Sequence, residues 1–214
     1  MSRRHYNFLD QLIHNVDTGL RTLSGNPAVT GRANPSQHQE ETELSEEQKT
    51  LAGRLMRINH AGEVAAQGLY QGQALTAKLP LVRRQMEQAA AEENDHLQWC
   101  RSRANELGTH TSLLDPLWYA GSVAIGAAAG LAGDKWSLGF VAETERQVVR
   151  HLDDHLQQLP REDVRSRAIL QQMREDELHH ATTAVKAGGA ELPTPIKRLM
   201  GLTSKIMTKS AFWL

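Results

Sequence analysis

The chain has 214 residues, enough for one well-packed domain with appended segments. Its 24 Lys and Arg residues nearly balance its 25 Asp and Glu residues, so the charge indicates neither a nucleic-acid partner nor an acidic tail. The single cysteine, Cys100, excludes an internal disulfide and a cysteine-based zinc site. Leu and Ala outnumber Val and Ile, and no stretch sustains polar–apolar alternation, so we predict an all-α fold.

Residues 1–44 are predicted to form an amphipathic helix followed by a flexible linker. Apolar residues recur at helical spacing over 6–23, whereas 24–44 is polar and contains two prolines and two glycines. The helix could lie on a membrane or on the body of the protein. Asp10 and Asp17 fit neither a secretory signal nor a mitochondrial presequence, so we expect the chain to stay where it is made.

Residues 45–190 are predicted to form the main helical domain, and 191–214 a separate C-terminal helix. A capping box at Ser45 and Gln48 starts the first long helix. Proline and glycine residues separate the helices that follow. The predicted helices span residues 45–78, 80–107, 115–133, 137–160, 160–188 and 196–213.

Four of these helices carry one glutamate within an otherwise apolar stripe. Glu93, for example, lies between Ala90 and Leu97 at helical spacing. An ionised carboxylate in such a stripe is costly unless a cation neutralises it, and no Lys or Arg occupies these stripes. The four glutamates predicted to point inward are Glu63, Glu93, Glu145 and Glu177.

Two of the glutamates are followed three residues later by a histidine on the same helix face. Four glutamates and two neutral histidines carry four negative charges, which two divalent ions neutralise. One glutamate from each of two helices and a Glu-x-x-His pair from each of two others form the ligand set of ferritin-like di-iron and di-manganese bundles. The two pairs are Glu93 with His96 and Glu177 with His180.

The spacing of the glutamates indicates two similar helical hairpins. The interval from Glu63 to Glu93 nearly equals that from Glu145 to Glu177, and a longer interval separates the hairpins. We therefore predict a ferritin-like four-helix bundle with one long crossover, which contains the apolar helix 115–133, and peripheral amphipathic helices.

Several other residues allow two interpretations. His60 is either a rival ligand or, as we favour, a residue that supports the ligands from outside. His151 is placed to support a ligand. Asp95 and Asp176 are either carboxylates that orient ligand histidines or exposed charges. We expect Tyr70 and Cys100 to pack in the core and His155 to lie at the surface.

Four motifs stand out: RINHAGE at 57–63, ENDH at 93–96, ETE at 143–145 and EDELHH at 175–180. Together they resemble the demethoxyubiquinone hydroxylase family of ubiquinone biosynthesis over about residues 45–214. The first motif is the most specific, because Glu-x-x-His blocks occur in many ferritin-like proteins. Segment 1–44 resembles bacterial members.

The resemblance implies a di-iron monooxygenase that hydroxylates a polyprenyl demethoxyubiquinol with O₂ and two reducing equivalents. Glu143 lies off the apolar stripe, so we assign Glu145 as the ligand of that motif. No Gly-rich dinucleotide fingerprint is present, which leaves NADH, a reductase or the quinol itself as the electron source. No catalytic residue is predicted beyond the iron ligands that the resemblance implies: Glu63, Glu93, His96, Glu145, Glu177 and His180.

Two segments are predicted to meet lipid, where a polyprenyl quinol resides. Segment 116–133 has no charge; it dips into the interface, packs on the bundle through its small residues or, least favoured, spans the bilayer. Segment 196–214 is a basic amphipathic helix suited to anionic lipid or to docking on the bundle. We expect a peripheral protein on the cytoplasmic face of the bacterial inner membrane. It is expected to be a homo-oligomer, with lipid-binding or other ubiquinone-biosynthesis proteins as candidate partners and no nucleic acid.

The alternative hypothesis is a ferritin-like protein for iron storage or peroxide detoxification, and a third is a quinone carrier without chemistry. A storage protein needs neither the uncharged segment 116–133 nor the basic segment 196–214, which favours the hydroxylase. A carrier does not need the ligand set.

Overall fold

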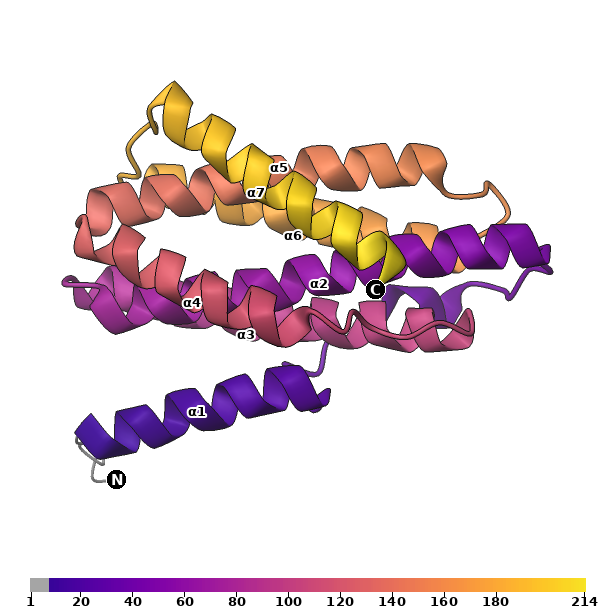
Figure 1. The fold of residues 1–214 in the computed structure, drawn as a ribbon, viewed down its shortest axis with the longest axis horizontal. Helices are drawn as coiled ribbons and strands as arrows, with labels where there is room; N and C mark the ends of the chain where they lie inside the picture. Colours follow the sequence, from indigo (N-terminus) through magenta and orange to yellow (C-terminus); the bar gives the residue numbers. More distant parts are fainter. Residues whose placement is uncertain (1–7) are drawn as a thin grey trace.

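The computed structural model describes residues 8–214 and shows a helical bundle with further helices packed on its outside (Figure 1). No β-strand occurs within residues 8–214, which confirms the all-α prediction. The elements are α1 (Phe8–Ser24), the 3-10 helix η1 (Pro35–His38), α2 (Glu46–Thr76), α3 (Pro80–Glu106), α4 (Asp115–Leu131), α5 (Asp134–Gln158), α6 (Val164–Lys186) and α7 (Thr194–Trp213).

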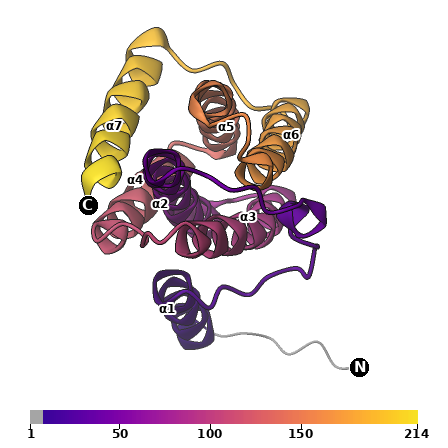
Figure 2. The same cartoon turned by 90° about the vertical axis from the view of Figure 1, so that its right-hand side faces the viewer.

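The four long helices α2, α3, α5 and α6 form the bundle, and α4 lies in the crossover from α3 to α5 (Figures 1 and 2). This arrangement confirms the ferritin-like prediction. Ser45 starts α2 with the expected capping box. The first helix was predicted to start at residue 6, and the part of that prediction before residue 8 lies outside the described residues.

Two helix starts differ from the prediction because local capping determines them. Helix α6 begins at Val164, not at Pro160, since the Asp163 side chain accepts a hydrogen bond from the backbone N–H of Ser166. Helix α5 begins at Asp134, before Ser137, because Gly133 adopts a φ of 112° and turns the chain directly into the helix.

Helix α4 packs closely along α2 through small residues. A side chain at Gly126 would meet the backbone carbonyl of Leu69, and one at Gly72 would meet the carbonyl of Val123. The opposite side of α4 leaves Leu117 and Leu131 exposed. The segment therefore packs on the bundle and also presents an apolar outer surface. Throughout residues 8–214, every helix is too short or too polar to cross a bilayer.

Helix α7 lies diagonally across α2 and α5 (Figures 1 and 2). Its end is attached to the bundle, because Ala211 is fully buried and the Arg54 guanidinium lies 4.8 Å from the centre of the Phe212 ring. The outer side of α7 exposes five large apolar side chains: Ile196, Leu199, Leu202, Ile206 and Trp213.

The close α2–α4 contact predicts that an added methyl group lowers the stability of the protein at some glycines of α4 and not at others. Gly126→Ala should lower the free energy of unfolding by about 1–3 kcal/mol, because its Cβ meets backbone that has no room to move. Gly121→Ala on the same helix is the matched control, since nothing lies within 4 Å of its Cβ. The control should be neutral or slightly stabilising. Urea unfolding followed by circular dichroism measures both; equal stabilities would contradict the packing described here.

Candidate metal centre

The six predicted ligands lie at mid-length on the four bundle helices, and all are buried. Helix α2 supplies Glu63 and α5 supplies Glu145, while α3 and α6 each supply a Glu-x-x-His pair. Four of the six side chains each have one ligand atom that lies within 4.8 Å of the ligand atoms of the other three. They are Glu63, Glu93, His96 and Glu177.

The two Glu-x-x-His pairs face each other across the bundle. The Nδ1 atom of His96 lies 2.8 Å from Glu93 Oε2 and 3.1 Å from Glu177 Oε1. The Nδ1 atom of His180 lies 3.2 Å from both Glu93 Oε1 and Glu177 Oε2. Each histidine therefore directs the same ring nitrogen at the carboxylates of both helices.

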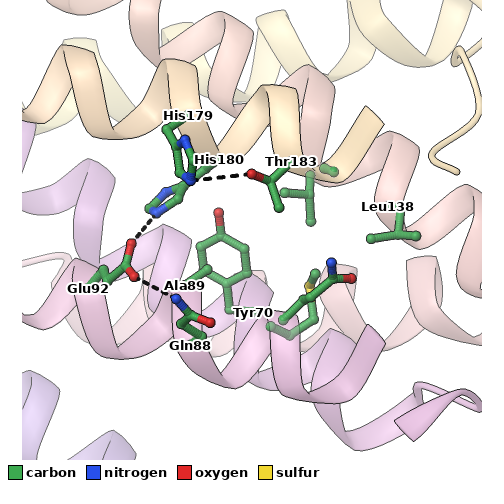
Figure 3. Close-up of a pocket in the computed structure, with 12 residues that line it drawn as sticks. Tyr70, Gln88, Ala89, Glu92, Leu138, His179, His180 and Thr183 are labelled. Carbon is green, nitrogen blue, oxygen red and sulfur yellow. Dashed lines mark hydrogen bonds and ion pairs between the residues drawn. The ribbon is translucent and has the colours of Figure 1, made fainter. Parts of the chain in front are cut away.

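The other nitrogen of each histidine contacts a carboxylate nearer the surface. His96 Nε2 lies 2.9 Å from Asp176 Oδ2, and His180 Nε2 lies 2.7 Å from Glu92 Oε2 (Figure 3). Such outer partners fix the orientation of metal-binding imidazoles. The first contact supports the histidine-orienting interpretation of Asp176.

Glu92 was not recognised from the sequence, although a signal for it existed. It directly precedes Glu93, as Asp176 directly precedes Glu177, so the two motifs align with an acid at the same place. Asp95, the other acid considered for this role, instead accepts hydrogen bonds from Thr30 and Arg32.

Tyr70 does more than fill the core. It is buried as predicted, and its hydroxyl donates a hydrogen bond to Glu145 Oε1. Burial and the negative charge of Glu145 raise the pKa of Tyr70 well above its usual value, so this hydroxyl keeps its proton. The bond fixes Glu145, which forms no ion pair with His96 or His180, whereas Glu63 Oε2 lies 3.8 Å from His96 Nδ1.

Burial and the charges of neighbouring groups shift the pKa values of the side chains in the cluster. Burial raises the pKa of Glu63 well above its usual value, and the charge of Glu93 adds to the effect. Burial and the charges of Glu177 and Glu93 do the same for Glu145. Burial opposes the ionisation of Glu93, but His96 and His180 outweigh it and hold its pKa low. Burial likewise opposes charge on His180, yet its interactions with the carboxylates of Glu177 and Glu93 raise its pKa to about 12.

These side chains fit a pair of divalent ions. Two buried oxygens, Glu93 Oε1 and Glu177 Oε1, accept no well-aligned hydrogen bond and have only a histidine Nδ1 nearby, at 3.2 and 3.1 Å, so each can accept a cation. Carboxylate oxygens and imidazole nitrogens together suit iron and manganese. A cavity of about 80 Å³ adjoins the cluster beside His180 and Tyr70 (Figure 3).

Three histidines that the sequence singled out lie outside this cluster. His60 Nδ1 lies 3.2 Å from Asp115 Oδ2 and joins α2 to α4, which supports its interpretation as a non-ligand. His151 packs its ring 3.9 Å from that of His155. The prediction that His155 is exposed is wrong: the residue is buried, its Nδ1 lies 2.9 Å from Asn59 Oδ1, and burial lowers its pKa to about 3.

A four-helix bundle that joins two Glu-x-x-His pairs with two further glutamates is typical of ferritin-like di-metal carboxylate proteins. Comparison with known proteins narrows this class, because residues 50–211 match the family described as "Ubiquinone biosynthesis protein COQ7". The chain belongs to this family.

Its relatives match over their full length. The chain is 59% identical over 214 residues to the 3-demethoxyubiquinol 3-hydroxylase of Nitrosococcus oceani, covering 100% of both chains. It is 58% identical over 211 residues to the protein of the same name from Acinetobacter baumannii, and 57% identical over 212 residues to that from Legionella pneumophila. In both cases 99% of this chain and 100% of the relative are covered.

The cluster predicts opposite effects of one substitution on stability and on metal binding. Glu145→Gln should raise the free energy of unfolding of the metal-free protein at neutral pH by about 1 kcal/mol. The raised pKa of Glu145 makes its burial costly where the unfolded chain is ionised, glutamine has no such cost, and an oxygen remains for Tyr70. The same change should weaken iron binding. Thermal unfolding without metal and iron titration measure the two effects.

Glu143→Gln is the matched control two residues away. Glu143 is also buried, but it accepts hydrogen bonds from Gln147 and Arg150 and not from members of the cluster. It should retain iron and gain no stability. The reverse result, with iron lost only in Glu143→Gln, would contradict the choice of Glu145.

Proposed function

We propose that this protein hydroxylates the ring of a polyprenyl demethoxyubiquinol, with two iron ions held by the six buried side chains named above. One oxygen atom of O₂ enters the ring and the other leaves as water, which consumes two electrons and two protons. NADH, a reductase or the quinol itself is the source of the electrons.

The observation that carries the proposal is the buried Glu and His cluster in a chain whose full-length relatives are named 3-demethoxyubiquinol 3-hydroxylase. Iron storage also uses a ferritin-like fold, but relatives with 56–59% identity over the full length favour the hydroxylase. Bound iron supplies the activation of O₂ and accepts electrons.

The chain's own residues have separate parts in this proposal. The carboxylates and histidines of the cluster hold the ions, and Asp176 and Glu92 orient the imidazoles. Apolar side chains of the adjoining cavity, such as Met86, Leu138 and Val141, limit the entry of water.

We further propose that the protein binds the cytoplasmic face of the bacterial inner membrane peripherally, since its substrate resides in lipid. The exposed apolar side chains of α4 and α7 support this, and Lys205 and Lys209 add positive charge on α7. We also propose that the protein self-associates and that it binds a lipid-binding protein or another protein of ubiquinone biosynthesis.

Product analysis tests the activity. Iron-loaded protein, a short-chain demethoxyquinol, O₂ and NADH or a chemical reductant should yield a product heavier by one oxygen atom, detected by mass spectrometry. Glu177→Ala should abolish turnover and most iron binding, while Glu175→Ala, an exposed acid on the same helix, should retain both. Full turnover by Glu177→Ala would contradict the site, and many irons per chain without product would favour storage.

Sedimentation with vesicles tests the membrane proposal. Leu202→Asp combined with Ile206→Asp should abolish co-sedimentation with anionic vesicles, because charge replaces exposed apolar groups on α7. Leu178→Asp is the matched control, since this leucine is similarly exposed on α6. Unchanged binding of the α7 variant, or equal loss in both variants, would contradict lipid contact through α7.

A further inference from the structure

Residues 28–41, here called the strap, lie along the seam between α3 and α6, the two helices that carry the Glu-x-x-His pairs (Figure 2). At one end Asn94 donates a hydrogen bond to the carbonyl of Ala28. In the middle η1 packs on α6. At the other end Glu41 accepts hydrogen bonds from Arg103 and Arg165. The segment predicted from composition to be a linker thus contacts both helices.

Arg32 projects from the strap toward the metal centre. Its Nε donates to Asp95 Oδ2 and one terminal nitrogen to Asp176 Oδ2, each at 2.9 Å. Its other terminal nitrogen lies 3.4 Å from His96 Nε2, and its guanidinium carbon lies 5.0 Å from the centre of the Trp99 ring. One planar cation therefore joins α3 to α6 beside His96.

The contact with Asp176 connects the strap to a predicted ligand. Asp176 Oδ2 is the atom that lies 2.9 Å from His96 Nε2, so Arg32 and His96 share one oxygen. Gln172 donates to the other oxygen of Asp176, at 3.0 Å. Both oxygens are therefore fixed, and the position of the shared one sets the orientation of the His96 ring.

We propose that Arg32 is a positioning residue for His96. By holding Asp176 in place, it sets the direction in which His96 Nδ1 faces the carboxylates, and so it tunes one of the two metal positions. The inference rests on the proposed metal centre and adds to it a residue from outside the bundle. The competing explanation is that Arg32 only anchors the strap.

Cobalt(II) binding to the metal-free protein distinguishes the two explanations, because the visible absorption of bound Co²⁺ reports ligand geometry. Arg32→Ala should bind Co²⁺ roughly 10- to 100-fold more weakly in competition with a chelator, with shifted absorption bands. Arg32→Lys should recover part of the affinity, since an ammonium keeps the charge but lacks the planar fork that spans Asp95 and Asp176.

Glu41→Gln is the matched control. It weakens the other attachment of the strap, to Arg103 and Arg165, without touching the metal centre. Faster proteolysis within residues 28–41 should show that the strap has loosened, while Co²⁺ affinity and spectrum stay as in the wild type.

The results of these measurements decide between the positioning role, simple anchoring of the strap and failure of the proposed metal centre. Wild-type Co²⁺ binding by Arg32→Ala, or equal weakening in Arg32→Ala and Glu41→Gln, would overturn the positioning role. If Arg32→Ala does not fold, Arg32→Lys decides: wild-type affinity and spectrum overturn the role, and weakened binding with shifted bands supports it. Failure of the wild type to bind either Co²⁺ or iron would instead refute the proposed metal centre.

Discussion

The burial of four glutamates at the centre of the bundle is the constraint on which the rest of the structure depends. Carboxylates removed from water repel one another and lose hydration, which is costly unless cations and hydrogen bonds compensate. The raised pKa values of Glu63 and Glu145 express this cost directly. His96 and His180 offset part of it, and a pair of divalent ions would neutralise the remainder.

Because the centre is destabilising without metal, other contacts must hold the helices together. Close backbone packing between α2 and α4 at Gly72 and Gly126 is one such contact. Another is the buried Arg103, which donates to Asp163 at 2.8 Å and to Ser166 at 3.0 Å and so joins α3 to α6. Both lie away from the glutamates, so the bundle keeps its shape while the centre remains open to ions.

The sequence identified the residues of the buried cluster because their signal is local. A glutamate in an apolar helical stripe is visible without knowing what packs against it, and all six predicted residues are buried at mid-bundle. The burial of His155 could also have been predicted in this way, since His155 continues the stripe of Val148 and Leu152 on α5. The prediction that it lies at the surface ignored that periodicity.

The contacts of Glu92, Tyr70 and Arg32 were not predictable by the same reasoning. Periodicity tells which side of a helix faces inward, but not which atom of a neighbouring helix it meets. Glu92 contacts a histidine on α6, and Tyr70 contacts a glutamate on α5. Arg32 lies in a polar segment with glycine and proline, where composition indicates flexibility and only the tertiary contacts reveal order.

The two sides of the bundle differ in chemistry, and the candidate metal centre lies between them. In Figure 2, α4 and α7 lie on one side of α2, where their outer surfaces expose apolar side chains. The strap lies on the far side, over α3 and α6, where it brings a cation to Asp95 and Asp176. The carboxylates that contact the outer nitrogens of the two histidines, Asp176 on α6 and Glu92 on α3, belong to neither helix of the apolar side. The lipid contact proposed for α4 and α7 would therefore leave the carboxylates beside His96 and His180 undisturbed.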